Sequence, residues 1–136
     1  MQYLIFKVNC NLYALDIRVV DEITEPKKLL DTQLTSDKLV QGIIYIREKC
    51  YPCINLAKFL SGFKEKDSCR YILTTYRDTQ VCYIVDEIIG IKDFSSTPIR
   101  NAIGVDYNLF SGILHDTDSL ILIWNMDYPL STPEFN

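Results

Sequence analysis

Val20-Asp21-Glu22-Ile23 is repeated letter for letter as Val85-Asp86-Glu87-Ile88, 65 residues further along a chain of 136 residues. Each copy follows a largely apolar run of the kind that forms β-strands, at residues 13–17 and 81–84 respectively. The spacing is close to half the length of the chain. We therefore predict two similar β units within one fold, an organisation typical of a docking module rather than an enzyme.

The composition is that of one globular domain with a substantial core. A chain of 136 residues is long enough to bury such a core, and 48% of its residues are hydrophobic. Nine tyrosines, together with many Ile, Val and Leu residues, favour strands. The net charge is −4, and the Lys and Arg residues form no stripe that would follow a phosphate backbone. We therefore expect no binding of nucleic acid.

The sequence also indicates a cytoplasmic protein that does not insert directly into the membrane. Its first residues contain no basic region and no cleavage site, so we expect no signal peptide. No apolar run approaches the roughly 20 residues that a membrane-spanning helix needs. The five cysteines are an odd number at irregular spacing, which favours free thiols in a reducing compartment.

Short runs with strand character cover most of the chain. They lie at residues 2–8, 12–15, 39–46, 51–56, 70–76, 80–85, 87–94, 110–114 and 120–125. A short helix is predicted at residues 57–60, and loops are predicted at 25–37 and 63–67. This pattern predicts a mainly β architecture, either a small β-barrel or a sandwich, with at most short helices.

Residues 16–23 are consistent with two interpretations. Apolar residues recur there at a spacing of three, at Ile17, Val20 and Ile23, which favours one or two helical turns capped by Asp16. A continued β-strand is the competing interpretation. The two differ in which side chains share a face, because a helix and a strand have different periods.

Cys50-Tyr51-Pro52-Cys53 is the motif most suggestive of catalysis. A C-x-x-C pair supports disulfide exchange when its first cysteine begins a helix after a strand, because the helix terminus lowers the thiol pKa. Here both cysteines lie in a predicted strand, where residues three apart point to opposite faces. Small apolar strand residues are the simpler interpretation. A small cytosolic thiol oxidoreductase that uses Cys50 and Cys53 is the alternative function.

Metal binding and hydrolytic chemistry have little support in the sequence. The other cysteines, at positions 10, 69 and 82, form no second pair, and tetrahedral zinc needs four ligands. The single histidine, His115, lies in a predicted hairpin turn beside Asp116, and no serine stands in a nucleophile elbow. Asp21 and Glu22 are adjacent, whereas glycosidase chemistry needs two acids at a set separation. We therefore expect no catalytic site, no metal and no cofactor.

Arg47 is the residue most suggestive of a contact with a partner. It ends an apolar strand at residues 42–46, and Glu48 and Lys49 are predicted to form the turn that follows. An arginine there projects from a rigid frame into solvent. A solvated turn charge is one interpretation. An interface anchor is the other, because arginine carries a planar donor fork and is enriched at the centres of interfaces.

Four stretches of the chain, in this order, resemble the CheW-like family of chemotaxis adaptors. They lie within residues 13–23, 40–56, 84–88 and 110–125. The second stretch is the most specific, and it reads Gly42-Ile43-Ile44-Tyr45-Ile46-Arg47 followed by Pro52-Cys53-Ile54-Asn55-Leu56. In order and spacing the resemblance spans nearly the whole chain, from about residue 3 to residue 130.

Four residues depart from the pattern of that family. Tyr45 stands where the family usually has Asn, and Asn55 stands where it usually has Asp. Cys82 replaces a common Gly, and Glu48 replaces the Gly that usually follows the arginine. Since glycine adopts left-handed backbone angles without strain, Glu48 implies a strained turn or a turn of another type.

The resemblance implies two small five-stranded β-barrels around a shared hydrophobic core. By this resemblance, residues 1–130 would form one domain of two intertwined subdomains. Residues 131–136 are expected to form a flexible tail because they are at the chain end, independently of the resemblance. It also implies a non-enzymatic adaptor that links the regulatory domain of a CheA-type histidine kinase to the cytoplasmic tips of methyl-accepting chemoreceptors. Arg47, Val20 and Glu22 are the residues that the resemblance assigns to partner surfaces. It implies no cofactor. A β-barrel interaction module outside chemotaxis is the remaining alternative.

Overall fold

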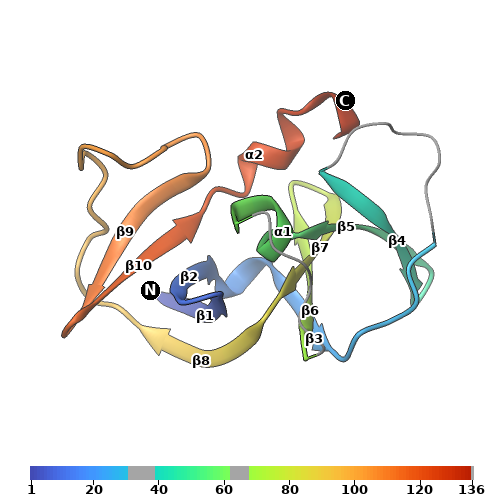
Figure 1. Cartoon of the computed structure of the whole chain (residues 1–136), viewed down its shortest axis with the longest axis horizontal. Helices are drawn as coiled ribbons and strands as arrows, with labels where there is room; N and C mark the ends of the chain where they lie inside the picture. The colour runs from blue at the N-terminus through green and yellow to red at the C-terminus, as the bar shows by residue number, and fades with distance from the viewer. Residues whose placement is uncertain (31–38, 62–67, 136) are drawn as a thin grey trace. The chain divides into compact units, whose positions relative to one another are not determined.

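The computed structural model describes residues 1–30, 39–61 and 68–135, which form ten strands in two five-stranded sheets (Figure 1). The strand order of the first sheet is β8 (Glu87–Asp93), β1 (Gln2–Val8), β2 (Asn11–Asp16), β10 (Ser119–Trp124), β9 (Phe110–Asp116). The order of the second is β3 (Val20–Thr24), β6 (Arg70–Tyr76), β7 (Thr79–Val85), β5 (Lys49–Asn55), β4 (Val40–Ile46). The helical segments are short: η1 (Ile17–Val19), α1 (Leu56–Ser61), α2 (Asp127–Leu130) and η2 (Pro133–Phe135).

The two sheets have the same topology. Each contains two antiparallel hairpins, β1–β2 with β9–β10 in one sheet and β6–β7 with β4–β5 in the other. One parallel pair joins the hairpins, β10 with β2 or β5 with β7, and a fifth strand lies at the outer edge. The prediction of two similar β units is therefore confirmed. In the described part of the chain neither sheet is closed by strand pairing, so "barrel" describes them only loosely.

The chain divides into two units, and the repeated tetrapeptide lies at both points where the chain passes between them. Unit 1 comprises Met1–Arg18 and Ile88–Asn136, and unit 2 comprises Val19–Glu87. The first copy of the tetrapeptide begins β3, and the second ends β7 and begins β8. The first copy therefore lies within edge strand β3, and the second copy reaches into the equivalent edge strand β8.

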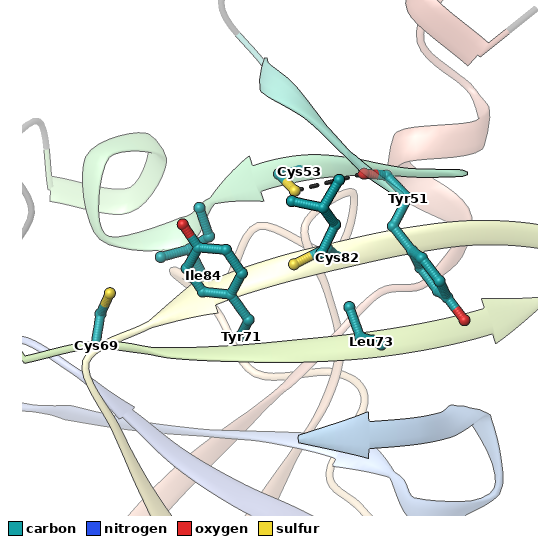
Figure 2. Close-up of a cluster of buried hydrophobic side chains, with 8 residues drawn as sticks. Tyr51, Cys53, Cys69, Tyr71, Leu73, Cys82 and Ile84 are labelled. Atoms are coloured by element: carbon teal, nitrogen blue, oxygen red, sulfur yellow. Dashed lines mark hydrogen bonds between the residues drawn. The ribbon is translucent and has the colours of Figure 1, made fainter. Parts of the chain in front are cut away.

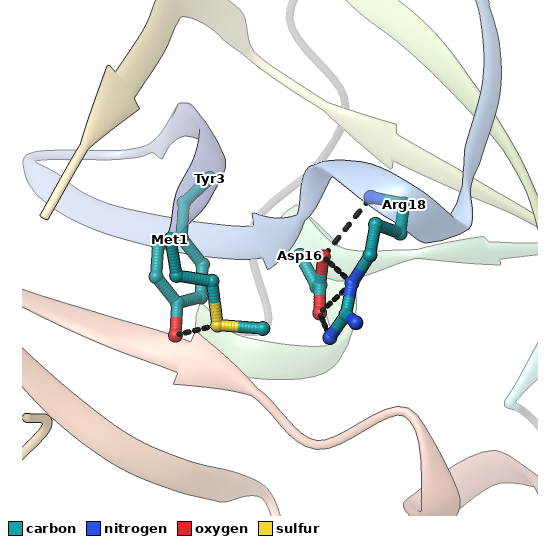
Figure 3. A network of polar contacts seen from close by, with 4 residues as sticks. All are labelled: Met1, Tyr3, Asp16 and Arg18. Atoms are coloured by element: carbon teal, nitrogen blue, oxygen red, sulfur yellow. Dashed lines mark hydrogen bonds and ion pairs between the residues drawn. The ribbon is translucent and has the colours of Figure 1, made fainter.

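The helical prediction for residues 16–23 is correct at its start and wrong from Val20 onward. Oδ1 of Asp16 accepts a hydrogen bond of 3.0 Å from the backbone N–H of Arg18, and the carboxylate also pairs with the Arg18 guanidinium (Figure 3). This cap accompanies a single 3₁₀ turn, η1. From Val20 the chain is strand β3, because β6 supplies backbone partners that a short exposed helix lacks.

Each unit has its own cluster of buried side chains, contributed by the inward faces of its strands. In unit 1 the cluster consists of Tyr3, Ile5, Ala14, Phe94, Leu114, Ile121 and Ile123. In unit 2 it consists of Ile44, Tyr51, Cys53, Cys69, Tyr71, Leu73, Cys82 and Ile84 (Figure 2). Several of these strands are buried on both faces, because β1, β6 and β7 each contain four or more consecutive buried residues.

Most other predicted elements are present, with their ends shifted by one or two residues. The prediction that His115 lies in a turn is wrong, because β9 extends to Asp116 and His115 is an exposed strand residue opposite Leu120. The predicted loop 63–67 and positions 31–37 of the predicted loop 25–37 lie outside the described residues.

Candidate partner-binding surface

Val20, Glu22 and Arg47, the three residues that the resemblance assigns to partner surfaces, line one hollow of unit 2. The hollow has a volume of about 400 Å³. Its other lining residues are Asp21, Ile46, Lys49, Tyr51 and Leu73. Tyr51 and Leu73 are 4% and 1% exposed and form its apolar floor, whereas the charged side chains lie nearer to solvent. The structure therefore brings the three residues of the sequence prediction together.

Arg47 owes its position to a two-residue turn between β4 and β5. The prediction of a turn at Glu48 and Lys49 is wrong by one residue, because Lys49 pairs with Ile46. The turn residues are Arg47 and Glu48, with φ angles of 50° and 66°. A two-residue type I′ turn requires positive φ at both positions, and its twist matches that of the strands. Glu48 thus occupies a position where glycine would be unstrained.

Arg47 and Glu22 form an ion pair, in which Nη1 of Arg47 donates to Oε1 of Glu22. The side chain of Arg47 is 74% exposed and that of Glu22 is 28% exposed. So exposed a pair contributes about 1 kcal/mol or less to stability, because solvent screens the charges and both long side chains lose freedom. The main effect of Glu22 is therefore to orient the guanidinium group of Arg47 beside the hollow, and its effect on the stability of the fold is small.

A β-bulge lies between the two β3 residues of the sequence prediction. β3 pairs with β6 at Val20 and Thr74 and then at Glu22 and Leu73, so the ladder skips Asp21. The extra residue shifts the alternation of β3 by one position. That shift explains how apolar residues come to stand three apart in a strand, which is the spacing that imitates a helix.

The carboxylate of Asp21 connects three strands at the hollow. Its Oδ2 accepts hydrogen bonds from the hydroxyl of Tyr51 on β5, at 3.1 Å, and from the hydroxyl of Thr75 on β6, at 2.5 Å. Burial, and then the hydrogen bond to Asp21, raises the pKa of Tyr51, so its hydroxyl stays protonated and able to donate. Sequence reasoning treated Asp21 only as one of two adjacent acids and did not single out Tyr51 for the site.

The hollow lies beside the line along which the edge strands β3 and β4 of the second sheet face each other without pairing, which we call the open seam. β3 and β4 are the two edge strands of this sheet, yet β3 side chains reach Tyr51 on β5 and Arg47 at the β4–β5 turn. Farther along, the segment after β3 closes the seam, because Leu30 and Ile43 exchange two backbone hydrogen bonds of 2.8 and 2.9 Å. At the hollow the seam is therefore crossed by side-chain contacts. Farther along, it is crossed by the backbone hydrogen bonds between Leu30 and Ile43.

The C-x-x-C motif is not arranged for thiol chemistry. Cys50 is exposed whereas Cys53 is buried, as expected for strand residues three apart. Cys53 lies among the core residues of unit 2 with Cys69 and Cys82 (Figure 2). Burial, and then the neighbouring Cys53 thiol, raises the pKa of Cys82. Catalysis needs a thiol of lowered pKa at an accessible position, so the alternative of a thiol oxidoreductase receives no support.

The remaining sequence candidates do not converge on a catalytic centre in the described part of the chain. Asp116, next to His115, receives a hydrogen bond of 2.5 Å from Nζ of Lys92. This bond and the charge of Lys92 hold the pKa of Asp116 below its usual value. Among the residues with described positions, no cluster of three or more His, Cys, Asp or Glu side chains is suited to a metal ion. None of the described helices has the length and apolar character to span a bilayer.

Comparisons with known proteins bear directly on this fold and surface. A family model described as CheW-like domain matches residues 2–133. Chemotaxis protein CheW of Thermotoga maritima is 26% identical over 91 residues, which are 66% of this chain and 60% of that protein. The match therefore spans less than two thirds of the length of that relative. The crystal structure of scaffolding protein TtCheW from Thermoanaerobacter tengcongensis covers 97% of this chain and 88% of its own, with a TM-score of 0.85 and 21% identity.

Two five-stranded sheets of equal topology, with a charged hollow at an open seam, define a mainly β domain of two similar units. The structural match to TtCheW supports the same fold over almost the entire chain. Because the family model covers residues 2–133, the chain belongs to the family of CheW-like domains. The resemblance recognised from four short stretches of sequence is therefore confirmed.

Proposed function

We propose that this protein is a non-enzymatic chemotaxis adaptor. It links the regulatory domain of a CheA-type histidine kinase to the cytoplasmic tips of methyl-accepting chemoreceptors. Family membership across residues 2–133 supports this function, as does the relative named as a chemotaxis protein. The observation that carries the proposal is the hollow of unit 2, which gathers Val20, Glu22 and Arg47 on one accessible surface.

The hollow provides three kinds of contact to a partner. The exposed guanidinium of Arg47 is a donor fork for a carboxylate or a carbonyl group, and Glu22 is an acceptor beside it. Val20 and the buried floor of Tyr51 and Leu73 offer apolar contact. An exposed arginine next to an apolar floor is typical of an interface hot spot.

The proposed mechanism is mechanical. By holding kinase and receptor together, the adaptor places the activity of the kinase under the control of the receptor. The mechanism needs no cofactor and no membrane insertion. The protein would act in the cytoplasm and be recruited there to membrane-associated receptor arrays.

Calorimetric titration with the regulatory domain of the host's CheA-type kinase tests the proposal. We expect saturable binding by the unaltered chain. Arg47→Ala should weaken it about tenfold or more, since loss of a central arginine removes over about 1.4 kcal/mol. Titration with a receptor cytoplasmic fragment tests the second partner in the same way. Binding to neither partner by a folded protein would favour an interaction module outside chemotaxis.

Arg77→Ala is the matched control for Arg47→Ala. Arg77 takes the equivalent place in the β6–β7 turn, with a φ angle of 49°, and its guanidinium carbon lies 5.2 Å from the centre of the Tyr76 ring. The Arg77→Ala variant should bind as the unaltered chain does. Arg47→Ala should also melt within about 3 °C of the unaltered protein, because its ion pair is exposed. A collapse of its melting temperature would instead make Arg47 a structural residue.

A further inference from the structure

The position of Glu22 at the hollow depends on the local backbone of β3. Glu22 lies directly after the β-bulge of β3, so its orientation depends on that bulge. In a strand, insertion or removal of one residue turns every later side chain to the opposite face. If β3 paired with β6 without the bulge, so that Asp21 took a regular place in the ladder, the side chain of Glu22 would point away from Arg47. Whatever holds the bulge therefore also sets the ion pair.

Asp21 is the bulged residue, and its side chain is tied from two directions. The hydroxyl of Thr75 binds it from β6, the ladder neighbour of β3. The hydroxyl of Tyr51 binds the same oxygen from β5, which lies three places from β3 in the strand order. Hydrogen bonds to an ionised carboxylate are stronger than those between neutral groups. The two hydroxyls thus fix the bulge against two separate strands.

We propose that Asp21 is the positioning residue of the partner-binding surface, holding the bulge of β3 so that Glu22 meets Arg47. This inference rests on the proposed function only for its consequence in partner binding. The geometry of the Glu22–Arg47 pair depends on Asp21 in the isolated protein as well. Tyr51 shares the task, because its hydroxyl supplies the cross-strand hydrogen bond.

The first test uses the protein alone and follows the side-chain N–H resonance of Arg47 by NMR. Asp21→Ala should move this resonance toward its position in Glu22→Gln, where the ion pair is absent. Asp21→Asn keeps one oxygen acceptor and should move it less. Tyr51→Phe removes only the hydroxyl and should move it in the same direction. The matched control is Tyr71→Phe, because the hydroxyl of Tyr71 donates to the backbone carbonyl of Lys27 and not to Asp21. It should leave the resonance in place.

The second test measures binding to the kinase regulatory domain in a double-mutant cycle. Asp21→Ala should weaken binding about three- to tenfold in the unaltered background and should have little further effect in Arg47→Ala. Equal weakening in both backgrounds would overturn the proposal, because Asp21 would then touch the partner itself. An unmoved Arg47 resonance in Asp21→Ala and Tyr51→Phe would also overturn it. If the unaltered chain binds no kinase domain, the proposed function fails and the NMR test still decides the role of Asp21.

Discussion

The two units build the same five-stranded pattern but join their edge strands through ion pairs of opposite polarity. In unit 2 the acid, Glu22, lies on β3 and the base, Arg47, lies at the turn of the neighbouring hairpin. In unit 1 the base, Lys92, lies on β8 and the acid, Asp116, ends β9. The two pairs do not occupy matching positions, because the repeat aligns Glu22 with Glu87 rather than with Lys92. The ion pairs are therefore features of the surface of each unit and not of the shared topology.

The backbone closure of the two units is, by contrast, the same. Leu30 and Ile43 exchange two backbone hydrogen bonds in unit 2, and Ile99 and Ile113 do so in unit 1. In each unit a glycine immediately precedes the strand residue of this pair. The shared feature belongs to the fold, and the differing charges belong to the surface. This distinction suggests experiments on the glycines, on the turns and on the ion pairs.

Substitution of the two glycines should have the largest effect. A Cβ on Gly42 would lie 2.8 Å from the carbonyl oxygen of Leu30, whereas a Cβ on Gly112 would lie 3.0 Å from Cβ of Pro98 and 3.3 Å from the oxygen of Ile99. Overpacking against backbone costs about 1–3 kcal/mol. We expect Gly42→Ala to lose about 2 kcal/mol of unfolding free energy and Gly112→Ala about 1 kcal/mol. Urea unfolding measures both.

The order of the two losses is the informative result. A larger loss for Gly112→Ala would mean that the segment before Ile113 is held more rigidly than the segment at Leu30, against the closer contact at Gly42. An unchanged m-value in both variants would indicate that only the native state has been destabilised.

The hairpin turns should give a smaller effect of opposite sign. Glu48 and Thr117 have φ angles of 66° and 47°, in the left-handed region that glycine tolerates best. The β-branched Thr117 is the more strained of the two by residue type. We expect Thr117→Gly to stabilise unit 1 by about 1 kcal/mol and Glu48→Gly to stabilise unit 2 by about 0.5 kcal/mol, partly offset by unfolded-chain entropy. Thermal melts of the two variants and of Asp78→Gly, another left-handed turn residue, compare the gains.

A loss of stability in Thr117→Gly would contradict this reading of the turn, since the weak 3.5 Å contact of its hydroxyl with Asp116 is too long to matter. The Asp78 variant calibrates the series, because aspartate tolerates the left-handed region better than glutamate or threonine. Its gain should be the smallest of the three.

Sequence patterning predicted most strands because alternation and apolar runs are local signals. β1 was placed at its observed bounds, Gln2–Val8, from a short apolar run, although Tyr3–Phe6 are all buried and do not alternate between the core and solvent. For residues 16–23 a helix and a strand both remained possible, because apolar residues stand three apart there, and only pairing with β6 reveals the bulge at Asp21. Local propensity carries no information about a partner strand that lies about fifty residues away.

The candidate site was partly predictable for the same reason. Arg47 drew attention through its place at the end of an apolar strand, and Val20 and Glu22 through resemblance to the family. The link from Asp21 to Tyr51 spans 30 positions and crosses the seam, so no short motif encodes it. The β-barrels implied by the resemblance are present in a loose sense, because in the described residues the edges of each sheet are bridged only locally. The hollow lies beside the part of the second sheet where its edges are not paired.

The smallest expected effect is electrostatic and concerns the ion pair of unit 1. The hydrogen bond and charge of Lys92 lower the pKa of Asp116 from its ordinary 3.8. The folded-state pKa therefore lies below the unfolded one. A group of this kind stabilises the fold above its unfolded pKa, and the contribution disappears as the pH falls through the folded pKa. NMR titration of the Asp116 carboxyl carbon should give a midpoint below 3.8.

Lys92→Gln tests whether Lys92 is the cause of the lowered pKa of Asp116. It should return the midpoint of Asp116 toward 3.8, while Arg47→Gln in unit 2 should leave it unchanged. Added salt should act in the same direction as Lys92→Gln, because the Lys92 side chain is 50% exposed and solvent ions screen the pair. If neither Lys92→Gln nor added salt changed the titration midpoint of Asp116, Asp116 would not pair with Lys92 in solution. The edges of unit 1 would then be joined by the backbone hydrogen bonds between Ile99 and Ile113 and by the hydrogen bond from Arg100 to Ser111, without an ion pair like that of unit 2.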